Sequence, residues 1–212
     1  MENIVARIGR WSAALSAIFG IAYILPQIAV AMGMIPSPWD QISLFVPSLF
    51  LASAFLVLMV SVCNYATQDR KVWGQIGASF AVVYAVLVSF VYFVELTVVI
   101  PKIIQGRGDE VALLLFDPGS FMQAVDGLGY GFMSLSALFA AQVFDGAGLI
   151  RWTRWALRAH GLLAPAILLS VRYPALIAIG ILWIITFPAS AILLYKVFSS
   201  PSMKIQQVID ET

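Results

Sequence analysis

Residues 72–100, VWGQIGASFAVVYAVLVSFVYFVELTVVI, contain a single charged side chain, that of Glu95. The hydrocarbon core of a membrane is about 30 Å thick, and a helix needs about 20 apolar residues to cross it. Because backbone polar groups in lipid must be hydrogen-bonded within the protein, an apolar run of this length predicts a transmembrane helix. The carboxyl group of Glu95 is the one feature of the stretch that a simple membrane span does not need.

Five further stretches are long and apolar enough for the same prediction, namely residues 11–33, 42–64, 120–144, 149–171 and 174–198. Together with residues 72–100 they predict an all-α fold, a polytopic integral membrane bundle of six transmembrane helices. The length of 212 residues suits a single domain that covers residues 1–212.

The composition supports a membrane protein and excludes several other classes. Hydrophobic residues make up 61% of the chain and charged residues 11%, whereas soluble domains are about half apolar and a quarter charged. A net charge of +1 without a basic patch gives no case for nucleic acid. The single cysteine, Cys63, and the single histidine, His160, exclude an intrachain disulfide and paired-cysteine or multi-histidine metal sites. We therefore expect no metal and no cofactor, and the expected partner is a membrane lipid or a lipophilic small molecule.

The lysines and arginines between the predicted helices indicate the orientation of the chain. Nine of them fall on one side, and these are Arg7, Arg10, Arg70, Lys71, Arg151, Arg154, Arg158, Lys196 and Lys204. The other side has only Lys102, Arg107 and Arg172. Because cytoplasmic loops carry the excess of Lys and Arg, both termini are predicted to be cytoplasmic. We expect an integral protein of a bacterial-type plasma membrane.

The longest connection, residues 101–119, lies on the outer side in this topology. Its apolar middle, EVALLLF at 110–116, is too short to span the membrane. It is expected either to lie in the membrane interface as a plain connection or to fold over the bundle as a lid.

Two carboxyl groups are predicted at matched depth in the outer half of the bundle. Glu95 precedes Pro101 by six residues, and Asp126 follows Ser120 by six residues. At 1.5 Å of rise per residue, each lies about 9 Å from its helix end. Because the two helices are consecutive and antiparallel, the two acids are expected to be neighbours.

Other polar and aromatic residues extend this predicted site. Gln27 and Ser48 lie at a similar depth on the first two helices, and Tyr92 is three residues before Glu95. Gln123 and Tyr130 are at i−3 and i+4 from Asp126 and therefore share its helix face. The full prediction has Glu95 and Asp126 as acid and base, and as substrate-binding residues Tyr92, Tyr130, Gln123, Gln27, Ser48 and Trp183.

Buried carboxyl groups in a membrane span are costly and usually functional. Two neighbouring carboxyl groups in a low dielectric are not both ionised, which places an acid beside a base. The sequence thus favours a membrane-embedded acid–base enzyme of isomerase or cyclase type, acting on a lipophilic, for example isoprenoid, substrate. Two alternatives stay open: a proton- or cation-coupled carrier or solute-binding component, and a non-catalytic accessory subunit whose acids only join helices by hydrogen bonds.

Overall fold

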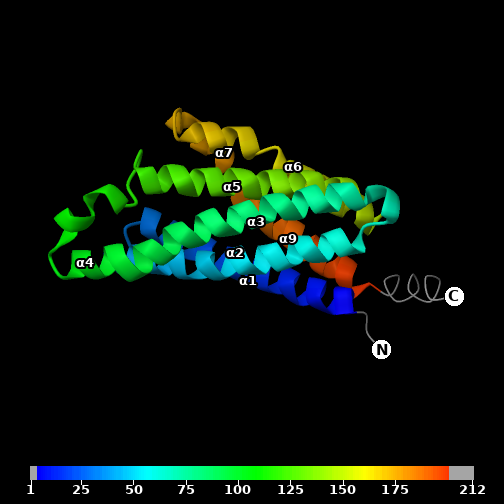
Figure 1. Ribbon diagram of the computed structural model, residues 1–212, viewed down its shortest axis with the longest axis horizontal. Coiled ribbons are helices and arrows are strands. Elements are labelled where there is room, and N and C mark those ends of the chain that lie inside the picture. The colour runs from blue at the N-terminus through cyan, green and yellow to red at the C-terminus, as the bar shows by residue number, and fades with distance from the viewer. Residues whose placement is uncertain (1–3, 201–212) are drawn as a thin grey trace.

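The computed structural model describes residues 4–200, and every regular element in this range is helical (Figure 1). The longer α-helices are α1 (Ile4–Ala31), α2 (Trp39–Tyr65), α3 (Lys71–Val94), α5 (Phe121–Ala140), α6 (Leu149–Gly161) and α9 (Trp183–Ser199). The shorter ones are α4 (Ile100–Ile104), α7 (Ala164–Ser170) and α8 (Ile177–Gly180). The prediction of an all-α protein is confirmed.

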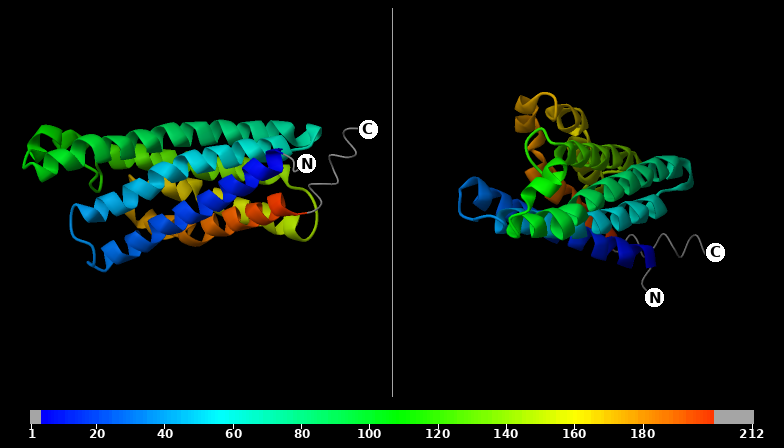
Figure 2. Two further views of the ribbon diagram at one scale, coloured as in Figure 1. Left: turned by 90° about the horizontal axis from the view of Figure 1, so that it is seen from below. Right: turned by 60° about the vertical axis from the view of Figure 1, so that its left-hand side comes forward.

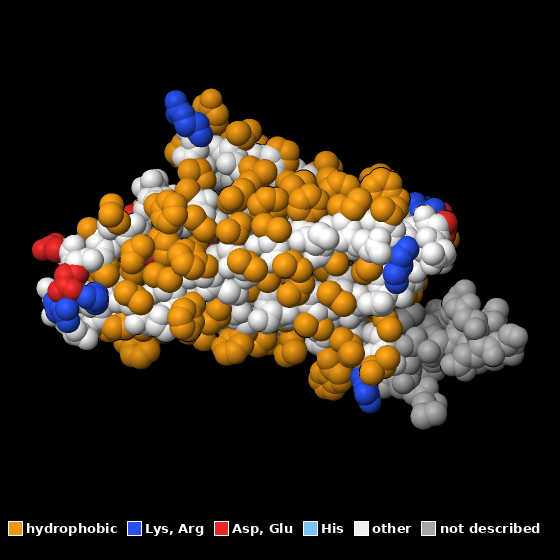
Figure 3. All heavy atoms as spheres, in the orientation of Figure 1, with side chains coloured by type: hydrophobic (Ala, Val, Ile, Leu, Met, Phe, Trp, Pro, Cys, Tyr) orange, Lys and Arg blue, Asp and Glu red, His pale blue; other side chains and the backbone are white. Residues whose placement is uncertain are grey.

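Five segments of the described chain are long and apolar enough to cross a membrane. They are Ile4–Ala31, Trp39–Tyr65, Gln68–Ile104, Phe121–Val143 and Pro174–Ser199. Their surface agrees with this reading, because charged side chains gather at the two ends of the face in Figure 3 and hydrophobic side chains cover the middle. Trp11, Phe93 and Ile185, for example, are each at least 60% exposed. Contiguous exposed apolar surface of this kind marks a membrane-facing or partner-facing region, and five such helices indicate an integral membrane protein.

The long helices form a closed ring in which each packs against the next. α1 contacts α2, α2 contacts α3, and α3 contacts α5. α5 contacts α6 and α7, α6 contacts α9, and α9 returns to α1. The start of α1 and the end of α9 lie at the same end of this ring (Figures 1 and 2). The ring brings residues that are far apart in the sequence to one shared interior.

The predicted helix at 149–171 is divided into α6 and α7, which are separated at Leu162 and Leu163. Pro165 stands in the first turn of α7, where its missing N–H group would have no helical partner in any case. α7 packs against α5, and in Figure 1 it lies above that helix. Neither part has the length of a span, so the sixth crossing stays a prediction.

The third predicted helix continues past its expected end at Ile100. After α3 the chain makes a π-helical turn, η2 (Glu95–Val99), and α4 then runs through Pro101 to Ile104. Proline lacks an N–H donor and its ring clashes with the carbonyl group four residues earlier in an α-helix. The wider π turn directly before Pro101 changes that hydrogen-bond pattern, and the helix therefore continues. Glu95 is nine residues from the observed helix end, or about 14 Å, deeper than the 9 Å expected from the sequence.

Candidate functional site

Glu95 opens the π-helical turn and is completely buried, with 0% of its surface exposed. Neither of its carboxyl oxygens has a hydrogen-bond partner within the described residues. A π turn is a rare distortion that often occurs at functional sites, and this one begins at a buried carboxyl group.

The surroundings of Glu95 are mostly apolar and come from α2 and from the connection before α5. η2 packs against α2 and against the 3-10 helix η3 (Gly108–Leu114). Phe45 of α2 stacks on Tyr92 at a ring distance of 5.1 Å and meets Phe116 edge-on at 5.3 Å. Val111 of η3 is 4% exposed. This connection therefore packs on the bundle, while its role as a lid stays a prediction.

Asp126, the second predicted acid, lies on α5. Its Oδ1 atom is buried and has no hydrogen-bond partner in residues 4–200. Tyr130 follows Asp126 by one helical turn on α5, and its hydroxyl group bonds that of Tyr92 on α3. The predicted closeness of Asp126 and Glu95 stays a prediction.

The tyrosine cluster, as we call Tyr23, Tyr84, Tyr92, Tyr130 and Trp183, is connected ring by ring. The hydroxyl groups of Tyr92 and Tyr130 lie 3.1 Å apart and share a buried hydrogen bond. The rings of Tyr84 and Tyr130 are 5.7 Å apart. Trp183 of α9 stacks on Tyr23 at 5.4 Å and on Tyr130 at 6.2 Å. Aromatic contacts of this kind fix the position of each phenol group.

The other predicted site residues are Gln27, Ser48 and Gln123, and they differ in their hydrogen-bond partners. Gln27 donates a long hydrogen bond of 3.5 Å from Nε2 to the hydroxyl group of Tyr23. Ser48 is fully buried, and its hydroxyl group has no partner among the residues that the structure describes. Gln123 accepts a hydrogen bond of 2.6 Å from the backbone N–H of Gly119. It therefore ties the end of the connection to the first turn of α5, where Ser120 is the N-cap residue.

Tyr23 and Tyr84 belong to the tyrosine cluster but were not among the predicted site residues, although each lies on a helix that carries one of them. A signal was present, because Tyr23 precedes Gln27 by four residues and Tyr84 precedes Tyr92 by two steps of four. Residues at that spacing lie on one side of a helix. Only the closed ring of helices shows that these sides face the same interior.

The arrangement provides groups for proton transfer in apolar surroundings. The carboxyl group of Asp126 can accept or donate a proton, and the phenol groups can hydrogen-bond a polar atom of a bound molecule. His160 has Nδ1 3.1 Å from the hydroxyl group of Thr186, and its ring lies beside Phe187, which in turn contacts Trp183 of the tyrosine cluster. Within residues 4–200 there is no group of three or more His, Cys, Asp or Glu side chains that could hold a metal ion.

Comparison of the chain with protein-family models, with curated proteins and with solved structures found no match. A fold alone does not define a function, since one fold can carry many unrelated sites. The function must therefore be argued from the geometry around Asp126 and Glu95.

Proposed function

We propose that the protein is a membrane-embedded acid–base enzyme of the isomerase or cyclase type that acts on a lipophilic substrate. The observation that carries this proposal is the position of Asp126, whose buried Oδ1 atom has no partner in the described chain and which lies one helical turn before Tyr130 of the hydrogen-bonded pair Tyr92–Tyr130. Proton transfer is efficient when an acid or base is held in fixed geometry and protected from water. Phenol groups that donate hydrogen bonds to a substrate oxygen can stabilise the charge that develops there.

In this mechanism Asp126 removes a proton from a carbon atom that lies between a carbonyl group and a carbon–carbon double bond of the substrate. The hydrogen-bonded hydroxyl groups of Tyr92 and Tyr130 hold the oxygen during this step. Asp126 then returns the proton to a different carbon atom, so that the double bond moves and no atom is gained or lost. Tyr92 lies three residues before Glu95 on one helix face, and its hydroxyl group bonds that of Tyr130, which follows Asp126 by four residues. This position suits Tyr92 to connect Glu95 with Asp126. Glu95 is the second acid of the proposal.

A specific observation also favours a second candidate, a proton- or cation-coupled carrier. Asp126 and Glu95 both have buried carboxyl oxygens without a hydrogen-bond partner in the described chain. Buried polar atoms are almost always satisfied, and an orphaned carboxyl oxygen marks a place where a proton or a cation can bind. A carrier would use the same two acids without changing the substrate.

For the topology we propose six crossings, with α6 and α7 together as the fifth, and cytoplasmic termini in a bacterial-type plasma membrane. Arg70 and Arg154 both pair with Asp145 and lie at the end of the bundle where α1 begins. They contribute part of the positive charge of that end. The positive-inside rule supports a cytoplasmic position for that end.

The orientation can be tested by cysteine labelling. The test starts from Cys63→Ser and adds Asp69→Cys or Asp109→Cys, followed by a membrane-impermeant thiol reagent on intact cells. We expect labelling of Asp109→Cys alone, whereas labelling of Asp69→Cys alone would reverse the orientation.

The experiment that tests the function is native mass spectrometry with lipid extraction, applied to the wild type, Asp126→Asn and Glu95→Gln. Asp109→Asn, which changes an exposed acid outside the site, is the control. We expect a specific lipophilic molecule to copurify with the wild type and the control and to be lost or altered in the two site variants. Incubation of that molecule with the wild type should give an isomer of equal mass. A bound molecule that never changes would favour the carrier, and equal behaviour of all four proteins would contradict both.

A further inference from the structure

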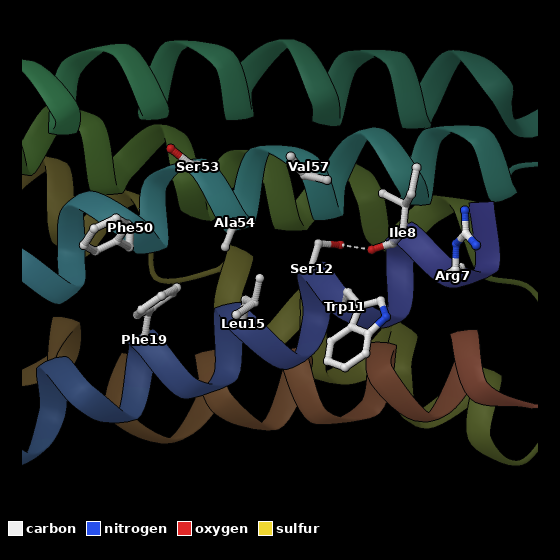
Figure 4. Close-up of a pocket in the computed structure, with 10 residues that line it drawn as sticks. All are labelled: Arg7, Ile8, Trp11, Ser12, Leu15, Phe19, Phe50, Ser53, Ala54 and Val57. Carbon is white, nitrogen blue, oxygen red and sulfur yellow. Dashed lines mark hydrogen bonds between the residues drawn. The ribbon is translucent and has the colours of Figure 1, made fainter. Parts of the chain in front are cut away.

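An apolar groove runs along the surface between α1 and α2, on a part of the molecule that the proposed function does not use (Figure 4). Its volume is about 510 Å³, which falls within the range of ligand sites. Ten residues line it, and these are Arg7, Ile8, Trp11, Ser12, Leu15, Phe19, Phe50, Ser53, Ala54 and Val57.

The groove exists because small residues face large ones across the two helices. Ser12 and Ala54 are 4% and 8% exposed and form its floor, while larger side chains stand beside them. The hydroxyl group of Ser12 donates to the carbonyl oxygen of Ile8 at 2.8 Å, so it is satisfied within its own helix. Figure 4 shows this bond at the base of the groove. The floor is thus apolar in effect and suits a hydrocarbon chain.

The two ends of the groove differ in chemistry. At one end Phe19 and Phe50 stack with a ring distance of 5.4 Å and lie across both helices. At the other end stands Arg7, whose side chain is exposed. The rise along α1 between Arg7 and Phe19 is about 18 Å, close to the roughly 15 Å of hydrocarbon in one leaflet of a membrane. The groove therefore has the length of one acyl chain, with a cation where the headgroup of a lipid would lie.

We propose that this groove binds one acyl chain of an anionic glycerophospholipid, whose phosphate group pairs with Arg7. Arginine is suited to this role because its guanidinium group donates two parallel hydrogen bonds to phosphate oxygens. A second copy of the chain would also cover apolar surface. However, the lining of this groove includes no Asp or Glu, so the same face of a second copy would not complement the charge of Arg7. The lipid satisfies both the apolar walls and the charged end.

The test measures lipid retention by native mass spectrometry in detergent that contains phosphatidylglycerol or phosphatidylcholine with the same acyl chains. The wild type should retain phosphatidylglycerol preferentially. Arg7→Gln should reduce that preference about fivefold, the contribution expected from one basic residue near an anionic surface. Ser53→Leu, which fills the groove with an apolar side chain, should reduce the retention of both lipids. Arg151→Gln, a change of an exposed arginine on α6, should have no effect and is the matched control.

Three outcomes would overturn the proposal. Equal effects of Arg7→Gln and Arg151→Gln would show only a general attraction between cations and anionic lipid. Unchanged retention in Ser53→Leu would place the lipid elsewhere. A wild type with the mass of a dimer that Ser53→Leu converts to a monomer would show that a second copy occupies the groove.

Discussion

The hydroxyl groups of Tyr92 and Tyr130 lie 3.1 Å apart and join α3 to α5 in the buried interior of the helix ring. Tyr130 also lies one helical turn after Asp126, the acid of the proposed site. The same bond therefore contributes to helix packing and to the geometry of the proposed site. These two contributions can be separated by experiment.

Removal of this hydrogen bond should cost a modest amount of stability, and the two tyrosines should not act additively. Tyr92→Phe and Tyr130→Phe each remove one hydroxyl group, and each is expected to lower the free energy of unfolding by about 1 kcal/mol. The double variant should lose less than the sum of the two, because the bond is already absent in either single variant. Denaturant unfolding in detergent measures all three, with Tyr195→Phe, a change of an exposed tyrosine, as control. Additive losses would show that the two hydroxyl groups act independently.

Gly161 should be essential for the close approach of α6 to α5. A Cβ atom at this position would lie 2.5 Å from Cβ and 2.7 Å from Cα of Leu138. Alanine gains about 1 kcal/mol over glycine in a helix, but overpacking against a backbone atom costs about 1 to 3 kcal/mol. We expect Gly161→Ala to lower the melting temperature. Gly108→Ala, whose Cβ would meet no atom nearer than 3.9 Å, should change it little. An equal effect of both would contradict this packing.

The helical architecture was largely predictable because a long apolar run has few structural solutions in a membrane. Residues 72–100 had to be a helix for that reason, and the span Gln68–Ile104 contains them. Two of the exceptions are at prolines, whereas the division of the predicted helix 174–198 between α8 and α9 is not. Pro101 ended the predicted helix but is accommodated by the preceding π turn, whereas Pro165 starts a new helix after a break. Local sequence shows that a proline disturbs a helix, and the surrounding packing decides how the chain responds.

The site was only partly predictable, since its geometry depends on how the helices rotate and pack. Equal depth in the sequence pointed to Glu95 and Asp126, of which the structure buries Glu95 fully and Asp126 in part, with carboxyl oxygens that have no partner in the described chain. Their closeness to one another stays a prediction. Depth is a single coordinate, and the rotation of each helix about its axis cannot be derived from it. The pairing of Tyr92 with Tyr130 therefore required the three-dimensional structure.

Glu110 should stabilise the connection before α5 in a way that depends on pH. Hydrogen bonds from Arg107, and then from Lys102, hold the pKa of its exposed carboxyl group below the ordinary value of 4.5. A lowered pKa in the folded state means that the contribution is complete above pH 4.5 or so and is lost as the pH falls through the lowered value. In amide hydrogen exchange at pH 7, Glu110→Gln should exchange faster than the wild type over residues 105–114.

The difference between these two proteins should vanish at low pH, where the carboxyl group of the wild type is also neutral. High salt should reduce it as well, because the ion pairs are exposed and therefore screened. Asp109→Asn changes a neighbouring exposed acid and is the matched control. A difference that persists at low pH would mean that Glu110 acts through its shape and not through its charge.

Replacement of Glu95 by methionine should make the protein more stable and less functional. The carboxyl group is fully buried and has no hydrogen-bond partner in the described chain, an arrangement that costs about 1 to 3 kcal/mol per unsatisfied group. Methionine has a similar shape without that penalty, so Glu95→Met is expected to raise the melting temperature, while Glu95→Gln, which stays polar, should not. A protein keeps a destabilising buried group where function requires it, and Glu95→Met should therefore also lose the bound lipophilic molecule. If Glu95→Met were instead less stable than both the wild type and Glu95→Gln, the carboxyl group would have a structural role, and the proposal that it is the second acid of the site would fail.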